Sequence, residues 1–269
     1  MTGPSADPGV SRTYGDVDRS SDPVEAATWM DRVGGYEAIA ASKRRSRELL
    51  AEAAASGPVL DVGCGLGEDV RSLGSGAIGL DPSVTMLTEA SARGGAFVRG
   101  DGARLPVRPG SLAGVRADRV LQHVADPEAV TRELLAALRT GGRIAVTDPD
   151  QATLDIVGPD AELAADVVRY RATVGIRHGF LAGRMPEVLA RAGAEPEGVE
   201  RFTLVLDDLD ASFGLKGWSA FLVDAGWWDA DRATAFDASL AAAVARGAYR
   251  YVVDIVLTWG RAAGASGGS

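Results

Sequence analysis

Three glycines at alternate positions, Gly63, Gly65 and Gly67, follow a short apolar run that begins at Val59. Glycine adopts positive φ and has no side chain, so such a turn lets a ligand approach the main chain closely. The sequence after Gly67 is compatible with a helix, whose first N–H groups would point at the bound molecule. A strand, a glycine turn and a helix N-terminus together predict a nucleotide-binding corner.

The glycine spacing bears on the kind of nucleotide. Dinucleotide-binding folds carry Gly-x-Gly-x-x-Gly, whereas this chain has Gly-x-Gly-x-Gly with Asp61 two residues before it. An acid at the end of the strand suits a ligand with a positive group better than it suits a pyrophosphate.

Polar residues also follow three further apolar runs, at Asp81, at Asp101 and at 118–123. Ligands of open α/β sheets bind at the carboxyl ends of the strands, so these residues are expected along one edge. Asp81 is placed to accept hydrogen bonds from two ribose hydroxyls, because a carboxylate only accepts. NAD-binding folds use an acid at the same place, so Asp81 alone does not distinguish the two ligands.

The elements that must position these residues alternate between strand and helix. The expected strands are 59–62, 77–80, 97–99, 112–117, 143–147, 201–206 and 249–259, and the main expected helices are 23–30, 36–55, 84–93, 127–138, 161–170, 184–192 and 231–245. This alternation predicts an α/β fold with a parallel sheet covered by helices on both faces.

The string Leu60-Asp-Val-Gly-Cys-Gly-Leu-Gly67 resembles the first motif of class I S-adenosylmethionine-dependent methyltransferases. Residues 99–107 resemble the family segment in which an acid, here Asp101, accepts the adenine amino group. Residues 117–127 and 141–150 look like the remaining motifs. The resemblance implies a doubly wound, mostly parallel seven-stranded sheet with an antiparallel last strand.

The resemblance also implies S-adenosylmethionine as the cofactor and S-adenosylhomocysteine as its product. The glycine loop would hold the methionine portion, Asp81 the ribose and Asp101 the adenine. The expected cofactor-binding residues are Asp61, Gly63, Cys64, Gly65, Gly67, Asp81, Pro82, Asp101, Gly102, Ala103, Asp118 and Arg119.

The chain has two histidines, His123 and His178, and an unperturbed pKa of about 6.5 lets either accept a proton near neutrality. Both are candidate catalytic residues, although a base is needed only if the attacking atom arrives protonated. The plainer interpretation of His123 is a solvent-facing residue at a helix start. The expected substrate contacts are Tyr14, Tyr36, Gln122, Asp150 and Trp218. Relatives often carry an aromatic residue where this chain has Gln151, so the substrate face is expected to differ.

Two further patterns have a structural and a functional interpretation. The run Lys43-Arg-Arg-Ser-Arg47 is typical of a solvated helix face, with binding of an acidic substrate as the alternative. The aromatic-rich segment 213–228 favours a core position over a pocket wall.

Composition narrows the class of protein. At 269 residues, one large α/β domain with additional segments is expected. The net charge of −9 argues against a nucleic-acid-binding surface.

A single cysteine, Cys64, excludes an internal disulfide, and no metal site is expected. No stretch approaches the roughly 18 apolar residues of a membrane span. We therefore expect a cytoplasmic protein without a membrane partner, as a monomer or homodimer.

The expected organisation is a mobile N-terminus at 1–13, a helical lid at 14–55, a methyltransferase domain at 56–260 and a mobile tail at 261–269. Substrate-covering insertions are expected around 151–195 and 208–247.

The expected reaction is methyl transfer to an O, N or C atom of a small molecule, with a secondary metabolite as the acceptor. Three alternatives remain open: a cyclase or isomerase that retains the cofactor, an NAD-dependent oxidoreductase, and a cofactor-sensing module. The glycine spacing and Asp101 disfavour the oxidoreductase.

Overall fold

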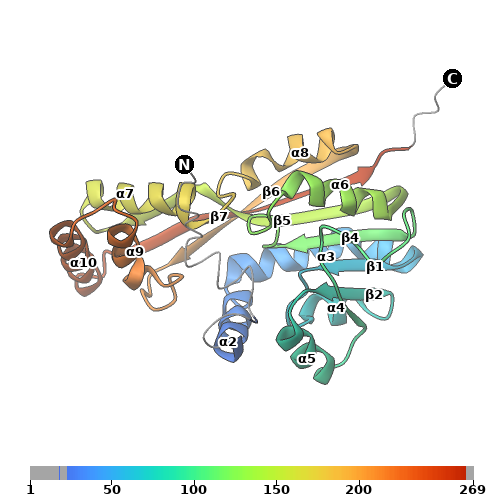
Figure 1. Ribbon diagram of the computed structural model, residues 1–269, viewed down its shortest axis with the longest axis horizontal. Helices are drawn as coiled ribbons and strands as arrows, with labels where there is room; N and C mark the ends of the chain where they lie inside the picture. The colour runs from blue at the N-terminus through green and yellow to red at the C-terminus, as the bar shows by residue number, and fades with distance from the viewer. Residues whose placement is uncertain (1–17, 19–22, 265–269) are drawn as a thin grey trace, which may run out of the picture.

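The computed structural model describes residues 18 and 23–264, and its centre is one mixed sheet (Figure 1). In the described part of the chain the sheet has seven strands in the order β3-β2-β1-β4-β5-β7-β6. All neighbours pair in parallel except β7, which is antiparallel to both β5 and β6. The strands are β1 (Val59–Val62), β2 (Ala77–Asp81), β3 (Phe97–Arg99), β4 (Leu112–Asp118), β5 (Leu138–Val157), β6 (Ala194–Leu206) and β7 (Arg250–Ala262). The predicted fold class is confirmed, including the antiparallel last strand.

Helices cover both faces of this sheet. The α-helices are α2 (Pro23–Gly34), α3 (Glu37–Ser56), α4 (Glu68–Leu73), α5 (Val84–Ala92), α6 (Pro127–Ala137), α7 (Ala161–Tyr170), α8 (Met185–Arg191), α9 (Trp218–Asp224) and α10 (Ala230–Ala245). A π-helical turn, η2 (Arg171–Gly175), continues α7, and short 3-10 turns, η3 (Ala182–Arg184) and η4 (Leu215–Gly217), precede α8 and α9. The helices α6 and α8 lie on one face of the sheet, and α3 crosses the other face (Figure 1).

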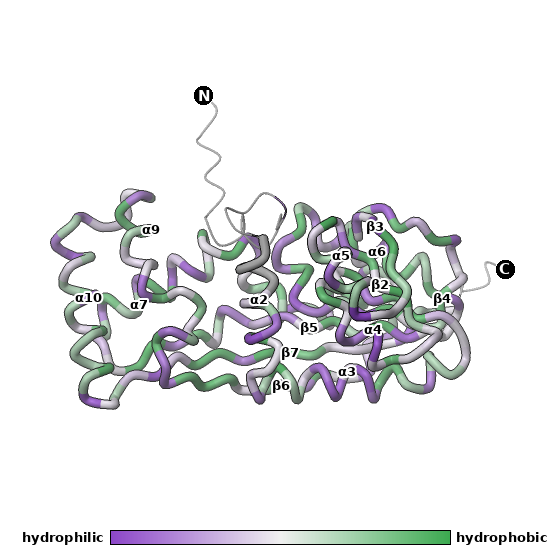
Figure 2. The backbone as a smooth tube through the Cα atoms, turned by 90° about the horizontal axis from the view of Figure 1, so that it is seen from below, coloured by the Kyte–Doolittle hydropathy of each residue, from purple (hydrophilic) through white to green (hydrophobic). Residues whose placement is uncertain are grey.

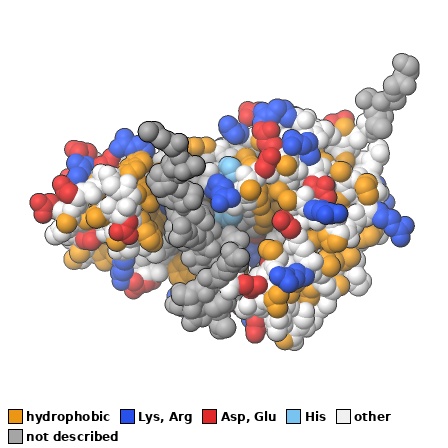
Figure 3. All heavy atoms as spheres, viewed as in Figure 1, with side chains coloured by type: hydrophobic (Ala, Val, Ile, Leu, Met, Phe, Trp, Pro, Cys, Tyr) orange, Lys and Arg blue, Asp and Glu red, His pale blue; other side chains and the backbone are white. Residues whose placement is uncertain are grey.

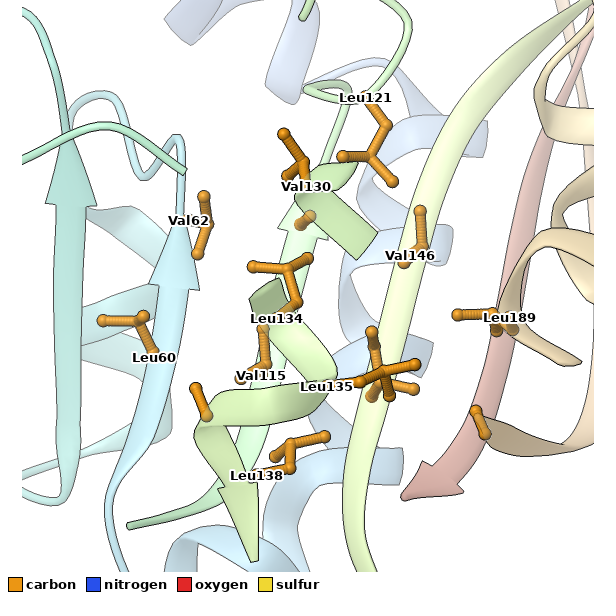
Figure 4. Packing of buried hydrophobic residues seen from close by; sticks show 14 of the residues in the cluster. Leu60, Val62, Val115, Leu121, Val130, Leu134, Leu135, Leu138, Val146 and Leu189 are labelled. Carbon is orange, nitrogen blue, oxygen red and sulfur yellow. The ribbon is translucent and has the colours of Figure 1, made fainter. Parts of the chain in front are cut away.

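The main core lies between the sheet and α6 (Figure 4). The side chain of Asp126 caps this helix by accepting a hydrogen bond from the N–H of Ala129, and Pro127 presets the backbone of its first turn. Leu134 has no exposed surface and packs with Leu60 and Val115 of the strands. The sequence of α6 therefore sets both the residue at which the helix begins and the apolar face that it packs against the sheet.

The strands β5, β6 and β7 extend beyond the rest of the sheet and carry α7, α9 and α10 at their far end (Figures 1 and 2). These helices pack with the extended strands in a second core that contains Trp218, Phe236 and Tyr251. The predicted strand at 143–147 is too short, because β5 continues through Asp148-Pro149-Asp150 to Val157. In the structure Pro149 pairs with Ile255, and a register shift follows between Asp150 and Asp155. The segment expected as an insertion from 151 therefore begins as strand.

The N-terminal helices differ in role, although both lie in the segment expected to form a lid. Leu49 and Leu50 of α3 are buried against the sheet, so α3 is a layer of the fold. The helix α2 instead stands out from the sheet beside α5 (Figure 1). At the other end of the chain, β7 continues to Ala262, two residues into the segment expected as a tail, because it stays paired with β6.

No helix in the described ranges has both the length and the apolar character needed to cross a bilayer.

The packing of α6 gives a stability prediction. Leu134→Ala should lower the free energy of unfolding by about 2–5 kcal/mol, because the fully buried side chain leaves a cavity. Chemical denaturation measures this change. The control is Val244→Ala on α10, where the side chain is 39% exposed, and its effect should stay within about 0.5 kcal/mol. Equal effects of the two substitutions would contradict the assignment of Leu134 to the core.

Candidate functional site

A cavity of about 1090 Å³ lies at the carboxyl ends of β1, β2, β4 and β5. The sheet topology places it there, because the strand order reverses between β1 and β4 and leaves a crevice. Histidine and basic side chains are visible near the middle of the face that Figure 3 shows. Among the expected residues the cavity is lined by Asp61, Gly63, Cys64, Gly65, Asp81, Pro82, Asp101, Gly102, Ala103, Asp118, Arg119, Gln122 and His123.

The three glycines of the loop have different neighbours. All three have positive φ, at 65°, 51° and 72°. A Cβ at Gly63 would lie 2.4 Å from Val120, and one at Gly67 would lie 2.4 Å from the Phe97 ring. At Gly65 the nearest atom is the Met30 methyl at 3.7 Å. Gly65 is thus the position where the missing side chain leaves room for a ligand, whereas Gly67 serves packing and does not line the cavity.

Asp81 holds this loop in place. One of its carboxylate oxygens accepts a hydrogen bond from the N–H of Gly65 at 2.9 Å, and the other accepts one from the N–H of Ser83 at 2.9 Å. Burial raises the pKa of Asp81, and these two hydrogen bonds oppose the rise. Asp18 lies nearby and accepts hydrogen bonds from the Ser83 hydroxyl and the Val84 N–H at the start of α5. The expected ribose site is therefore a rigid carboxylate beside the glycine loop.

Asp101 lies on the rim of the cavity and is exposed. One of its oxygens accepts a hydrogen bond from the N–H of Ala103 at 2.9 Å, which closes its own turn. A Cβ at Gly102 would lie 3.1 Å from Val62, so the loop packs closely on the end of β1.

Asp61 faces a buried arginine. Its carboxylate lies 2.9 Å from Nη1 of Arg116 on β4, and both side chains are 2% exposed. Arg116 also contacts Asp118 at 2.8 Å through Nη2, and its Nε donates to the hydroxyl of Ser46 at 3.0 Å. Asp61 was expected to contact the ligand directly. Asp61 lines the cavity and also forms this ion pair, which ties the end of β1 to β4.

The basic run of α3 belongs to the same network. Asp69 at the start of α4 is 3.0 Å from Lys43, 2.5 Å from Arg47 and 3.0 Å from Arg116. Burial pushes the pKa of Asp69 up, but Arg116, Lys43 and the hydrogen bond from Arg47 outweigh this and hold it at about 2. The prediction of a solvated helix face was wrong for Lys43, which is 9% exposed, because its partner lies on an element 26 residues away.

The part of the cavity lined by the loop after β4 and by β5 has polar atoms without hydrogen-bond partners. Within the described part of the chain, these include Oε1 of Gln122, Oε1 of Gln151 and Nδ1 of His123. Burial, and then the positive charges of Arg171, Arg119 and other neighbours, lower the pKa of His123 to about 4. The ring is therefore neutral at neutral pH and can accept a hydrogen bond.

Arg119 has an unusual backbone. Its φ is 58°, one of two positive values among the described non-glycine residues, and its N–H donates to the carbonyl of Thr147 at 2.6 Å. Residues held in this region of φ/ψ space cluster at functional sites, because the surrounding structure must support the strain. Asp148 lies beneath this loop, and burial raises its pKa well above the ordinary value. The backbone N–H groups of Gln122 and Leu121 face its carboxylate and oppose this rise.

Several expected site residues do not line the cavity. Nε2 of His178 donates a hydrogen bond to the carbonyl of Val124 at 3.0 Å in the tautomer that carries its proton there, so His178 supports the loop after β4. The Tyr36 hydroxyl donates to Ala211, Asp150 pairs with Arg201 at 3.3 Å, and Trp218 is a core residue whose Nε1 donates to Phe213. Tyr14 lies outside the described residues.

The structure also adds residues that the sequence analysis missed. Phe213, Tyr251, Val253 and Ile255 form an apolar wall, and Arg171 and Arg177 also line the cavity. Phe213 could have been found as part of the aromatic-rich segment. Nothing in the local sequence marked the two arginines as site residues. Their segment reaches the cavity only because the extended β5–β7 pair places it there.

Comparison with known proteins agrees with this geometry. A family model described as a methyltransferase domain matches residues 60–146. An uncharacterised protein of transposon TN4556 from Streptomyces fradiae is 31% identical over 232 residues, covering 81% of this chain and 67% of that protein. A demethylmenaquinone methyltransferase from Mycolicibacterium vanbaalenii is 37% identical over 109 residues, covering 39% of this chain and 47% of that protein. The chain thus spans only about half of this second relative.

Two solved structures share the fold. The YcgJ protein of Bacillus subtilis is 19% identical with a TM-score of 0.55, covering 82% of this chain and 99% of that one. Phosphoethanolamine N-methyltransferase 2 of Haemonchus contortus is 14% identical with a TM-score of 0.54, covering 94% of this chain and 61% of that one.

The ion-pair network predicts a specific acid sensitivity. A carboxylate whose pKa falls from 3.8 unfolded to about 2 folded stabilises the protein above about pH 5, and this stabilisation is lost as the pH falls towards 2. Asp69→Asn should therefore lower the free energy of unfolding at pH 7 by about 3–5 kcal/mol, because it leaves three cations without their shared partner. Its stability should also fall less steeply than that of the wild type between pH 5 and pH 3.

Urea denaturation across this pH range measures both effects. The control is Glu48→Gln, which removes an exposed partner of Arg45 and should change stability by less than about 1 kcal/mol. An identical acid profile for Asp69→Asn and the wild type would contradict the network.

His123 gives a second pH prediction. Its pKa is about 4 folded and about 6.5 unfolded, so the unfolded chain takes up the proton first and the protein loses stability as the pH falls from 6.5 to 4. This difference corresponds to about 3 kcal/mol. His123→Gln should remove that part of the pH dependence, while His178→Gln should retain it. Denaturation at pH 7 and pH 4.5 measures it, and an unchanged slope in His123→Gln would count against the buried neutral ring.

Proposed function

The chain belongs to the class I S-adenosylmethionine-dependent methyltransferase family, and we propose that it methylates an O, N or C atom of a small molecule from secondary metabolism. One observation carries the proposal. A single cavity joins a glycine-lined, acidic half to a half with buried polar atoms and an apolar wall. A cofactor and an acceptor can therefore meet in one cavity.

The glycine-lined half fits S-adenosylmethionine. The Asp81 carboxylate has about four acceptor positions, and the N–H groups of Gly65 and Ser83 use two of them. The remaining two suit the two ribose hydroxyls. The open space at Gly65 admits a ligand against the main chain.

The other acids of this half also match groups of the cofactor. Oδ1 of Asp118 is buried and has no hydrogen-bond partner in the described part of the chain, and an ammonium group would satisfy it. Asp101 retains one oxygen beyond its own turn, which suits the amino group of adenine. We assign the methionine portion to Asp118 and the Gly63–Gly65 backbone, with Asp61 holding Arg116 in place behind them.

When bound, S-adenosylmethionine supplies an electrophilic methyl group on a sulfonium. The work left to the protein is to hold the acceptor in line, and such alignment contributes up to about 7–11 kcal/mol of a reaction barrier. Gln122, Gln151 and His123 present acceptor atoms on the other side of the cavity. A neutral His123 accepts a hydrogen bond from an acceptor hydroxyl or amine and orients its lone pair.

The size and charge of the cavity support a small acceptor. Its volume of about 1090 Å³ is at the upper end of the roughly 300–1,000 Å³ of small-molecule sites, which leaves room for a cofactor and one small molecule. The net charge of −9 disfavours nucleic acid as the acceptor.

Calorimetric titration tests the cofactor site. S-adenosylmethionine and S-adenosylhomocysteine should bind, and Asp81→Asn should weaken both at least tenfold, because it removes a charged hydrogen-bond acceptor worth about 1.5–3 kcal/mol. The matched control is Asp155→Asn, an exposed residue outside the cavity, which should bind like the wild type. Binding of NAD in place of these ligands would reject the proposal.

A screen of small molecules with mass detection tests the reaction. A methylated product should gain the mass of one methyl group, and His123→Gln should lower kcat with a smaller effect on cofactor affinity. An acceptor that is consumed without gaining a methyl group would instead identify a cyclase or isomerase that retains the cofactor.

A further inference from the structure

We infer that the acceptor is an uncharged molecule with two hydroxyl groups on a flat apolar ring, and that Gln122 and Gln151 select it by hydrogen-bonding to these hydroxyls. The inference rests on the proposed function for the place of the acceptor. It adds the chemical class of the substrate and two residues that determine specificity.

The first argument is where the chain keeps its carboxamide side chains. The sequence contains no asparagine and only two glutamines, Gln122 and Gln151. Gln122 follows β4 and Gln151 lies on β5, yet both line the same cavity. A carboxamide is uncharged and offers both an acceptor oxygen and N–H donors. The matching group on a ligand is therefore uncharged and both donates and accepts hydrogen bonds, as a hydroxyl group does.

The second argument is that these side chains are buried with an acceptor unused. Gln122 and Gln151 are 5% and 2% exposed, and Oε1 of each has no hydrogen-bond partner among the described residues. The same holds there for Nδ1 of the neighbouring His123, whose ring is neutral. Buried polar atoms are normally paired, because an unsatisfied one costs free energy. Bound hydroxyl groups supply the missing donors, whereas a charged group buried against these neutral side chains would lose its hydration without gaining a counter-charge from them.

The third argument is that one short segment ties the two glutamines together. The N–H of His178 donates to the carbonyl of Gln122 at 3.2 Å, and the N–H of Gln151 donates to the carbonyl of Gly179 at 3.0 Å. Residues 178 and 179 are consecutive, and consecutive Cα atoms lie about 3.8 Å apart. The backbones of the two glutamines are therefore held at neighbouring points, so one small molecule can reach both side chains.

The apolar wall describes the rest of the ligand. The Phe213 ring packs at 5.5 Å from the Tyr251 ring, and both residues line the cavity with Ile255. Phe213 has a φ of 52°, and its carbonyl accepts a hydrogen bond from Nε1 of Trp218 at 3.1 Å. Strained residues of this kind cluster at ligand sites, where the surrounding structure holds them in place. A wall that contains aromatic rings suits a flat ring in the ligand.

A series of matched probes tests the hydroxyl groups. Catechol, its monomethyl ether guaiacol and its dimethyl ether veratrole are titrated into the protein saturated with S-adenosylhomocysteine. Catechol should bind at least about tenfold more tightly than veratrole, with guaiacol between them, because a site built to bind a hydroxyl group rejects the analogue that lacks it. The diol cis-1,2-cyclohexanediol, which has no flat ring, should bind more weakly than catechol. The charged analogues 3,4-dihydroxybenzoate and dopamine should bind no more tightly than catechol.

Variants test the two glutamines. Gln122→Met and Gln151→Met keep the length of the side chain and remove the amide, so each should reduce the preference for catechol over veratrole to less than about threefold. The matched control is Glu187→Met, at an exposed position of α8 outside the cavity, which should retain the preference. Binding of S-adenosylhomocysteine shows that a variant is folded. If one buried variant fails to fold, the other variant and the wild-type series still decide.

Four results would overturn the inference. They are equal binding of catechol and veratrole, absence of catechol binding, a preference that both methionine variants retain, and tighter binding of either charged analogue than of catechol. These titrations transfer no methyl group. A preference for catechol in a protein that methylates no compound would therefore keep the inference while the proposed function fails, and methylation of a compound without hydroxyl groups would do the reverse.

Discussion

The site depends on the burial of Arg116 among acids from three other positions. An arginine in the middle of a sheet is costly unless its charge and its donors are matched. Its partners come from the end of β1, the end of β4 and the start of α4, and Ser46 of α3 accepts from its Nε. The elements that carry the glycine loop must therefore meet at one point. For Asp61, the effect of burial exceeds that of the neighbouring Arg116 and raises its pKa to about 6. The network therefore contributes more to fixing how β1, β4 and α4 meet than to the free energy of unfolding.

The cavity has two halves because the sheet has two parts. The short strands β1, β2 and β3 end at the glycine loop, Asp81 and Asp101, and these supply the acidic half. The long strands β5 and β7 continue past that edge, and the other half is lined by Tyr251, Val253 and Ile255 of β7 together with Arg171 and Phe213. The half proposed for the cofactor is thus built by local turns at strand ends, whereas the half proposed for the acceptor lies against a second core packed around Tyr251.

The residues that line the glycine-loop half of the cavity could be placed together from sequence for a physical reason. Each of its residues lies within a few positions of a strand end, so a local pattern of apolar run, glycine and acid places it. The prediction was less successful where a residue had a distant partner. Lys43 pairs with Asp69 and Asp61 with Arg116, and no local pattern distinguishes a solvated charge from one that a distant partner will bury.

The sequence by itself determined the alternating strands and helices, the glycine loop and the acids at the strand ends, because these follow from backbone preferences and from short-range periodicity. It could not determine where the half proposed for the acceptor lies. That half depends on how far β5 pairs with β7, and this pairing joins residues about a hundred positions apart, with Thr153 accepting a hydrogen bond from the N–H of Asp254. Only the tertiary structure brings Arg171, Phe213 and Gln151 to one cavity, because long-range strand pairing and a shared core decide which distant segments become neighbours.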